Sequence, residues 1–228
     1  MKEENPFEDK TVAQEWIDSI ENQGSRTREM EIYPMLNSWV KEFKPETIIE
    51  VGSGQGICSA AFDTGELEYV GIEPSEYLLH RAQEKYANAQ RTFVQGDAYS
   101  LPLDAESADA AFSVGVWFHI DDLDRAHAEL ARVLRKDGRL LIFTADIGAR
   151  DVWESWFDKP KVDGKRVQGA VFVPGGRLSK NIFYFHSTKE IAESLEKHGF
   201  IIEDIKTIGF GGGERTRGIW VAIRAKKK

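Results

Sequence analysis

The sequence predicts an α/β fold in which helices cover both faces of a parallel β-sheet that ends with one antiparallel strand. From residue 47 onward, short apolar runs alternate with amphipathic helical segments, which is typical of a parallel sheet. The last two predicted strands, 200–207 and 218–224, are joined only by a short glycine-rich link. Because such a link is too short for a parallel crossover, the final strand has to run antiparallel to its neighbour.

The N-terminal part of the chain is predicted to be helical. Apolar residues recur at helical spacing over 11–19 and again over 28–43. The second helix is expected to end before Pro45, because a residue that precedes proline avoids helical backbone angles.

Strands and helices then alternate through the middle of the chain. One helix is expected to begin with Ser75 as its N-cap, and Lys136-Asp137-Gly138 is expected to form the turn before the fifth strand. The strands are predicted at 47–51, 69–72, 92–94, 108–114 and 139–144, and the helices at 56–62, 75–86 and 123–134.

The segment 145–183 departs from this alternation. It contains Trp153, Trp156 and Phe157 but no clean periodicity. Because it is long for a plain loop, we expect a lid over a site, and a surface hairpin is the alternative. A helix over 188–198 then leads into the two final strands.

The composition of the chain limits the kinds of partner and the cellular compartment that we expect. The net charge of −8 argues against a broad nucleic-acid-binding surface, which needs a basic face. No apolar run reaches the length of a membrane span, and the first ten residues lack the apolar stretch of a signal peptide. The single cysteine, Cys58, excludes an internal disulfide. We therefore expect a cytoplasmic protein.

Three strand ends carry residues suited to a nucleoside ligand. The first strand runs into Gly52, Gly54 and Gly56, and glycine allows a ligand to approach the backbone closely. Glu73 ends the second strand, where a carboxylate can bind ribose hydroxyls or instead cap the next helix. Asp97 follows the third strand, where it can accept from an adenine amino group or instead serve as a turn residue.

Taken in order, these segments resemble the nucleoside-site motifs of class I S-adenosylmethionine-dependent methyltransferases, in the UbiE-like or type 11-like branch. The matching stretches are EVGSGQG at 50–56, GIEPS at 71–75, GDAYSLPL at 96–103, DAAFSVGVWFHI at 109–120 and RVLRKDGRLLIF at 132–143. One departure is Lys136-Asp137-Gly138, where the family often has Pro-Gly-Gly.

The resemblance covers about 46–144 and implies a Rossmann-like sheet of seven strands in the order 3-2-1-4-5-7-6, with strand 7 antiparallel. We accordingly divide a single predicted methyltransferase domain, 1–228, into four parts. These are an N-terminal helical cap at 1–45, a cofactor-binding core at 46–144, a lid or insertion at 145–187, and a C-terminal helix and strand pair at 188–228.

The resemblance also assigns each part of the cofactor S-adenosylmethionine to residues of this chain. Gly52, Ser53 and Gly54 would face its methionine part, and Glu50 would lie near its amino group. Glu73 would bind the ribose. Asp97 and Ala98 would bind the adenine, between apolar walls formed by Ile72, Pro74 and Tyr99. Val114 and Gly115 would lie beside the reactive methyl group.

The implied reaction is methyl transfer to a small-molecule acceptor, with S-adenosylhomocysteine as product. His119 is the candidate general base by position, and a histidine that anchors the loop is the alternative. Tyr33 and Trp117 are candidates for covering the sulfonium or the acceptor by cation–π contact. Arg26 and Arg28 could clamp an acidic acceptor or be solvated residues at a helix start. No metal site is expected, because the histidines lack metal-ligand spacing.

Two other functions stay open at this stage. A nicotinamide-dependent oxidoreductase shares the glycine turn and the acidic residue of the second strand, although the third glycine of its fingerprint would fall at Ile57. A non-catalytic nucleoside-binding protein could keep the same fold. The sequence specifies neither the acceptor nor an oligomeric state.

Overall fold

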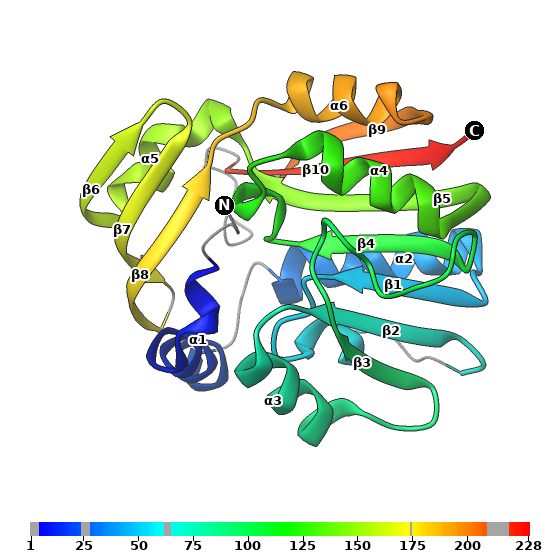
Figure 1. Ribbon diagram of the computed structural model, residues 1–228, viewed down its shortest axis with the longest axis horizontal. Coiled ribbons are helices and arrows are strands. Elements are labelled where there is room, and N and C mark those ends of the chain that lie inside the picture. The colour runs from blue at the N-terminus through cyan, green and yellow to red at the C-terminus, as the bar shows by residue number, and fades with distance from the viewer. Residues whose placement is uncertain (1–4, 24–27, 62–64, 174, 209–218) are drawn as a thin grey trace.

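A seven-stranded sheet forms the centre of the computed structural model, which describes residues 5–23, 28–61, 65–173, 175–208 and 219–228 (Figure 1). β10 runs antiparallel to both of its neighbours, and all other pairs in this sheet are parallel. The fold, the strand order and the reversed last strand are therefore confirmed. From edge to edge the strands are β3 (Arg91–Gln95), β2 (Glu68–Glu73), β1 (Thr47–Val51), β4 (Ala108–Val114), β5 (Leu134–Ala145), β10 (Trp220–Lys227) and β9 (Phe200–Ile208).

Helices bury both faces of this sheet, which explains why its central strands are continuous apolar runs. On one face, α4 (Leu123–Val133) and α6 (Thr188–Lys197) pack over buried side chains such as Ile49 and Ile142. On the other face, α2 (Tyr33–Phe43) and α3 (Glu76–Tyr86) pack over Ile48 and Phe112. Ser75 caps α3, as predicted, by accepting a hydrogen bond from the Leu78 N–H.

Two local predictions were wrong. After Gly56 the chain forms only the short 3₁₀ helix η3 (Ile57–Ala60) in place of the helix expected over 56–62, whose last residue lies outside the described ranges. The Ser59 hydroxyl donates to the Gly56 carbonyl at 2.6 Å, and a serine bonded in this way competes with a regular helix. The expected turn at Lys136-Asp137-Gly138 is instead an irregularity within β5, with Asp137 at a φ of +64°.

The segment after β5 forms a second sheet, so a surface hairpin is not what the structure shows. α5 (Arg150–Ser155) is followed by three antiparallel strands, β6 (Phe157–Asp163), β7 (Arg166–Val173) and β8 (Gly176–Tyr184). Trp153, Phe157 and Phe183 bury their rings in a shared apolar cluster that holds α5 and the strands together. This small sheet lies beside the carboxyl ends of the parallel strands (Figure 1).

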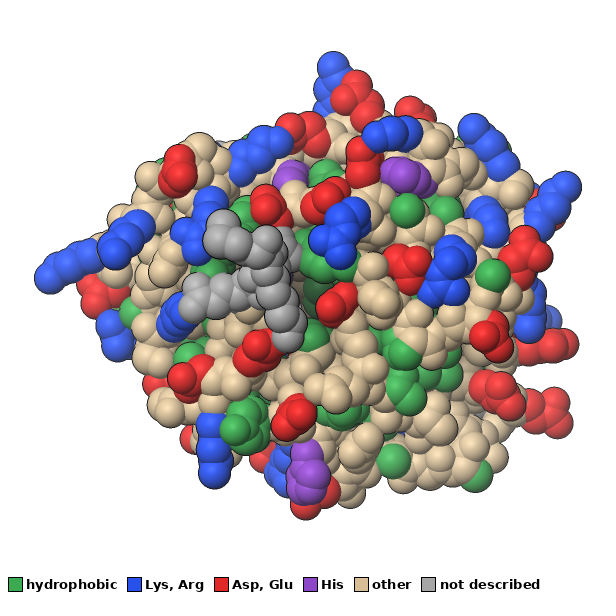
Figure 2. Space-filling model, in the orientation of Figure 1, with side chains coloured by type: hydrophobic (Ala, Val, Ile, Leu, Met, Phe, Trp, Pro, Cys, Tyr) green, Lys and Arg blue, Asp and Glu red, His purple; other side chains and the backbone are tan. Residues whose placement is uncertain are grey.

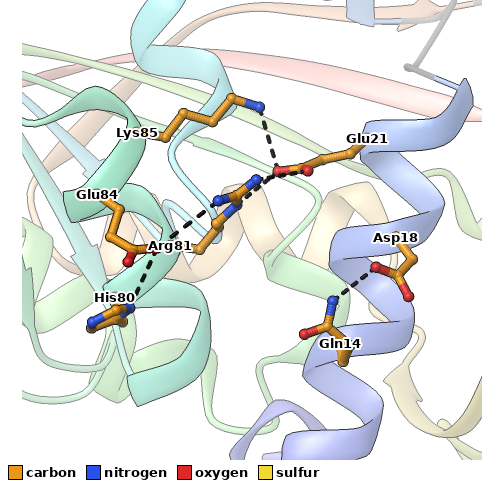
Figure 3. A network of polar contacts seen from close by, with 7 residues as sticks. All are labelled: Gln14, Asp18, Glu21, His80, Arg81, Glu84 and Lys85. Carbon is orange, nitrogen blue, oxygen red and sulfur yellow. Dashed lines mark hydrogen bonds and ion pairs between the residues drawn. The ribbon is translucent and has the colours of Figure 1, made fainter.

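The N-terminal helix α1 (Lys10–Gln23) contacts both α3 and β8 (Figure 1). Figure 3 shows the polar contacts of its exposed side, where the Glu21 carboxylate accepts from Arg81 at 2.8 and 2.9 Å. Exposed ion pairs of this kind contribute at most about 1 kcal/mol. The apolar contact of Ala13 and Ile17 with Leu78 is therefore the stronger attachment of α1 to α3. A π-helical turn, η2 (Arg28–Ile32), precedes α2. No helix among the described residues is long and apolar enough to cross a bilayer.

Candidate functional site

A cavity of about 770 Å³ opens beyond the carboxyl ends of β1, β2 and β4. Because parallel strands end at the same edge of a sheet, the loops that follow them converge on one crevice. The N-terminal segment, α1 and the small three-stranded sheet supply the opposite side of the cavity. The cavity therefore brings together residues from both ends of the chain.

The glycine loop after β1 lines this cavity with its backbone. Gly52 and Gly54 adopt φ angles of +74° and +55°. The N–H groups of Gly52 and Ser53 both donate to the Ile72 carbonyl, at 2.8 and 3.0 Å, which ties the loop to β2. A Cβ atom on Gly54 would meet no atom within 4 Å. The loop thus presents open space beside Gly54, where a ligand can approach the backbone.

Glu73 lies at the end of β2, buried and facing this loop. One of its carboxyl oxygens accepts from the Gly54 N–H at 2.8 Å, and the other accepts from the Ser75 N–H at 2.9 Å. Each oxygen keeps a further lone pair for a ligand hydroxyl. Burial raises the pKa of Glu73 to about 7, against the lowering effect of these two hydrogen bonds. Glu73 also lines the cavity.

Asp97 and Ala98 follow β3 on the same side of the cavity. The Asp97 carboxylate accepts the Tyr99 N–H at 2.8 Å, which is a turn contact, and it retains a second oxygen. Among the described hydrogen bonds, none uses the Ala98 N–H. Pro74 and Tyr99 line the cavity as expected, whereas Ile72 is fully buried in the core and is not among the lining residues.

Glu50 is the most deeply buried carboxyl group of the cavity, with 1% of its surface exposed. The Tyr69 hydroxyl donates to its carboxylate. Burial nevertheless raises the pKa of Glu50 to about 8, and it raises the pKa of the neighbouring Cys58 thiol well above its ordinary value. Cys58 is accordingly a packed, protonated thiol at neutral pH.

These carboxyl groups predict a pH dependence of stability for the ligand-free protein. The folded pKa values of Glu50 and Glu73, about 8 and about 7, exceed the ordinary value of 4.5. The folded protein therefore binds more protons than the unfolded chain, so the free energy of unfolding falls as the pH rises. Between pH 6.5 and pH 8 the expected loss is on the order of 2 kcal/mol. Denaturant unfolding at the two pH values measures it.

Glu50→Gln should flatten this dependence, whereas Glu76→Gln, at an exposed position of α3, should leave it unchanged. Near and below pH 6.5, His119, His127 and His186 work in the opposite direction, because burial lowers the pKa of each histidine below its ordinary value of 6.5. A stability that rises between pH 6.5 and pH 8 would contradict the assignment.

Two polar side chains of the glycine loop are buried without a partner among the described residues. Gln55 is 2% exposed, and neither its amide oxygen nor its amide nitrogen has a hydrogen bond. Ser53 is 4% exposed, and its hydroxyl group likewise has no hydrogen bond among the described residues. Both residues line the cavity. Unpaired buried polar groups are costly, so they indicate a ligand that completes them. Gln55 is not among the residues predicted from the sequence, although its position between two glycines was a usable signal.

Val114 ends β4, Gly115 follows it, and both residues line the cavity. Gly115 has a φ of +74°, and its N–H donates to the Phe143 carbonyl at 2.9 Å. A Cβ atom at this position would lie 3.4 Å from the Trp220 ring and 3.7 Å from the Phe118 ring. The cavity therefore turns from a polar into an aromatic environment beside Gly115.

His119 lines the cavity at this aromatic end. Its Nδ1–H donates to the Ile182 carbonyl of β8 at 2.7 Å, because a carbonyl oxygen can only accept. The neutral ring then has no proton on Nε2, and burial keeps it neutral by lowering its pKa to about 4. His119 thus anchors its loop to β8 while its Nε2 remains an acceptor.

Tyr33 and Trp117, the candidates for covering the sulfonium or the acceptor, do not line the cavity. The ring of Trp117 is 1% exposed in the core, where its Nε1–H donates to His127 Nε2 at 2.8 Å. A buried indole N–H needs a partner, and His127 supplies it from α4. This corrects the expectation for Trp117. Tyr33 packs at the start of α2 and does not line the cavity. Arg28 does line it, and Arg26 lies outside the described residues.

Charges around the site are mixed in sign. Figure 2 shows acidic and basic side chains interspersed over one face of the molecule, with no continuous basic patch on that face. Among the residues that the structure describes, no group of three or more His, Cys, Asp or Glu side chains is placed to hold a metal ion.

Comparison with known proteins agrees with this geometry. Residues 49–142 match the family described as a methyltransferase domain. The ubiquinone/menaquinone biosynthesis C-methyltransferase UbiE of Campylobacter jejuni is 30% identical over 166 residues, which cover 64% of this chain and 63% of that protein. An uncharacterized methyltransferase of Mycobacterium ulcerans is 32% identical over 103 residues, which cover 45% of this chain and 40% of that protein. The chain thus spans less than two thirds of the length of these curated relatives.

Solved structures share the fold. An S-adenosylmethionine-dependent methyltransferase from Mesorhizobium loti superimposes with a TM-score of 0.62 at 19% identity, and the match covers 83% of this chain and 96% of that one. The family match lies within the part of the chain, about 46–144, that carries the resembling motifs. The resemblance stated from the sequence is confirmed.

Proposed function

Because residues 49–142 match the methyltransferase domain family and the fold agrees with it, we propose that the protein transfers the methyl group of S-adenosylmethionine to a small-molecule acceptor. The observation that carries this proposal is the placement of Glu73. Its buried carboxyl group faces the glycine loop at the end of β2 and lines the same cavity as Asp97 and Ala98.

The residues present fit this cofactor. Ser53 and Gln55 bring unpaired buried polar atoms to the cavity, and the space beside Gly54 is open. In the proposed arrangement, Gly52, Ser53 and Gly54 hold the methionine part, and Glu50 lies near its amino group. Glu73 binds the ribose. Asp97 and Ala98 bind the adenine, with Pro74 and Tyr99 as its apolar walls.

When bound, the cofactor supplies a methyl group activated by a sulfonium charge. The contribution of the chain is to position the reactants and to exclude water. Holding acceptor and methyl group in line can supply roughly 7–11 kcal/mol of barrier reduction at best. Val114 and Gly115 line the point of transfer, and the aromatic rings beyond Gly115 exclude water from it. His119, with a pKa of about 4, accepts a hydrogen bond but holds a proton only weakly at neutral pH.

An oxidoreductase is disfavoured by the geometry after the glycine loop. A bound dinucleotide places its pyrophosphate at the N-terminus of a helix. Here the loop continues into the short 3₁₀ helix η3, and Ile57 occupies the position of the third glycine. The loop therefore lacks the helix terminus on which that function depends.

We also assign the reaction to the cytoplasm and to a small-molecule acceptor. The single, buried Cys58 supports a reducing compartment. The net charge of −8 and the interspersed surface charges in Figure 2 support a small molecule over a nucleic acid.

Release of S-adenosylhomocysteine tests the proposal. The protein would be incubated with S-adenosylmethionine and a panel of neutral and charged small molecules, with Glu73→Gln as the matched inactive variant. Acceptor-dependent release by the wild-type protein alone is expected. Tight cofactor binding with no release in any mixture would favour the non-catalytic alternative.

Gln55→Leu should change stability and cofactor affinity in opposite ways. Removing two unpaired buried polar atoms should raise the free energy of unfolding of the ligand-free protein by about 1 kcal/mol. The same change removes cofactor contacts, so the affinity for S-adenosylhomocysteine should fall about ten-fold. Thermal unfolding and calorimetric titration measure the two effects. An unchanged affinity would remove Gln55 from the cofactor site.

A further inference from the structure

The cavity has a second end, beyond Gly115, that the cofactor does not account for. We call it the acceptor chamber and define it by six lining residues, Phe118, His119, Trp153, Asn181, Phe183 and Trp220. It is continuous with the proposed point of methyl transfer, because the rings of Phe118 and Trp220 lie within 4 Å of a Cβ atom placed on Gly115. A molecule in the chamber is therefore adjacent to Gly115.

The wall of the chamber is aromatic and rigid. The Phe118 ring lies 4.5 Å from Phe183 and 5.6 Å from Trp153, and Trp153 lies 5.3 Å from Trp220, measured between ring centroids. The Trp153 Nε1–H donates to the Ile219 carbonyl at 2.9 Å, which fixes the indole. Phe183 is 4% exposed and Trp153 2%. Such a preformed wall suits a flat, apolar ligand that stacks against it.

His119 and Asn181 contribute polar groups to the same cavity, one an acceptor and one a donor. His119 uses Nδ1–H on the Ile182 carbonyl, which leaves Nε2 as an acceptor. The Asn181 Oδ1 accepts the Ile182 N–H at 2.8 Å, which fixes the orientation of the amide. Its Nδ2 has no hydrogen bond among those described and is left as a donor. Asn181 lies on the same face of β8 as Phe183, whose ring is 5.2 Å from that of His119.

A hydroxyl group satisfies both polar groups at once, because it donates to His119 Nε2 and accepts from Asn181 Nδ2. An ammonium group cannot accept from Asn181, and a carboxylate cannot donate to His119. None of the six residues that define the chamber carries a fixed charge to pair with either. The chamber thus combines an aromatic wall with an acceptor and a donor that suit a hydroxyl group.

Resting on the proposed function, we propose that the chamber binds the methyl acceptor and that this acceptor is an aromatic ring compound bearing a free hydroxyl group. Its ring stacks against Phe118, Phe183 and the two tryptophans. Its hydroxyl group lies between His119 and Asn181.

Probe binding tests this class. The wild-type protein, saturated with S-adenosylhomocysteine, would be titrated with 2-naphthol, with its saturated counterpart decahydro-2-naphthol, and with 2-naphthoate. We expect 2-naphthol to bind at least about ten-fold more tightly than either, given the stacking energy of aromatic pairs and the cost of leaving polar groups unpaired. Equal binding of the saturated alcohol or of the carboxylate would overturn the proposal.

Substitutions of chamber residues test whether 2-naphthol binds in the chamber. Phe183→Leu should weaken 2-naphthol about ten-fold and leave S-adenosylhomocysteine affinity unchanged. Phe185→Leu is the matched control, since Phe185 is 1% exposed in the same apolar cluster but does not line the cavity. If Phe183→Leu fails to fold, His119→Asn serves, because the amide keeps an N–H for the Ile182 carbonyl while the acceptor Nε2 is lost together with the ring. Unchanged 2-naphthol affinity in a folded variant would overturn the proposal.

The same titrations distinguish a failure of the proposed function from a failure of the proposed acceptor class. A wild-type protein that does not bind S-adenosylhomocysteine contradicts the proposed function. A protein that binds S-adenosylhomocysteine tightly but shows no preference for 2-naphthol contradicts the acceptor class alone.

Discussion

Glu73→Gln is expected to weaken the binding of S-adenosylhomocysteine by about 100-fold at pH 8, where the Glu73 carboxyl group is largely ionised, because two hydrogen bonds to a charged group are worth roughly 3 kcal/mol. The Glu73 carboxylate now accepts hydrogen bonds from the Gly54 and Ser75 N–H groups. In the variant, the glutamine NH₂ group would face one of these two donors. One buried donor would then lose its partner, at a cost of about 1–3 kcal/mol in the free energy of unfolding. Calorimetric titration and denaturant unfolding measure the two effects separately.

Glu76→Gln is the matched control for this experiment. Glu76 is exposed in the first turn of α3, three residues after Glu73. Its replacement should change stability by no more than about 0.5 kcal/mol and should not alter ligand affinity. If Glu73→Gln binds S-adenosylhomocysteine as tightly as the wild-type protein, Glu73 is not a ligand of the ribose.

Gly52→Ala should mainly lower the stability of the fold, whereas Gly54→Ala should mainly weaken cofactor binding. Both glycines have positive φ, which costs an L-residue about 1–2 kcal/mol. At Gly52 a Cβ atom would also lie 2.3 Å from Val116 Cγ2, so the neighbouring side chain has to move, which adds roughly 1–3 kcal/mol. Gly52→Ala should therefore destabilise the fold by roughly 2–5 kcal/mol.

Gly54→Ala meets no atom within 4 Å, so its loss of stability should be limited to the backbone strain. Its new methyl group would occupy the open space of the cavity and block the approach of the methionine part. We expect cofactor binding to fall at least about ten-fold while the protein stays folded. Normal binding by Gly54→Ala would show that the cofactor does not approach the loop at this residue.

The strands of the central sheet could be predicted because each strand is encoded by the pattern of a short run of neighbouring residues. The run from Thr47 to Val51 has the apolar composition of a strand buried on both faces, and the structure places a strand at those residues. The reversal of β10 followed from the length of one link. The helix expected over 56–62 failed because hydrogen bonding within the loop, such as that of Ser59 to Gly56, overrode the helical spacing.

The sequence could predict that Gly52, Glu73 and Asp97 line one cavity, because each lies at or just after a strand end, and strand ends meet at one edge of a parallel sheet. Trp117 and Gln55 show where this reasoning stops. Trp117 is adjacent to the lining residue Phe118, but its partner His127 lies on α4, and no sequence pattern predicts that contact. The acceptor chamber likewise depends on long-range packing, because β8 and β10 meet the end of β4 only in the folded chain.

Parallel calorimetric titration of the wild-type protein with S-adenosylhomocysteine and with NADH tests the central claim most directly. A cavity built for a sulfonium nucleoside should bind S-adenosylhomocysteine in a 1:1 complex and show no saturable binding of NADH. Binding of NADH without binding of S-adenosylhomocysteine would contradict the account.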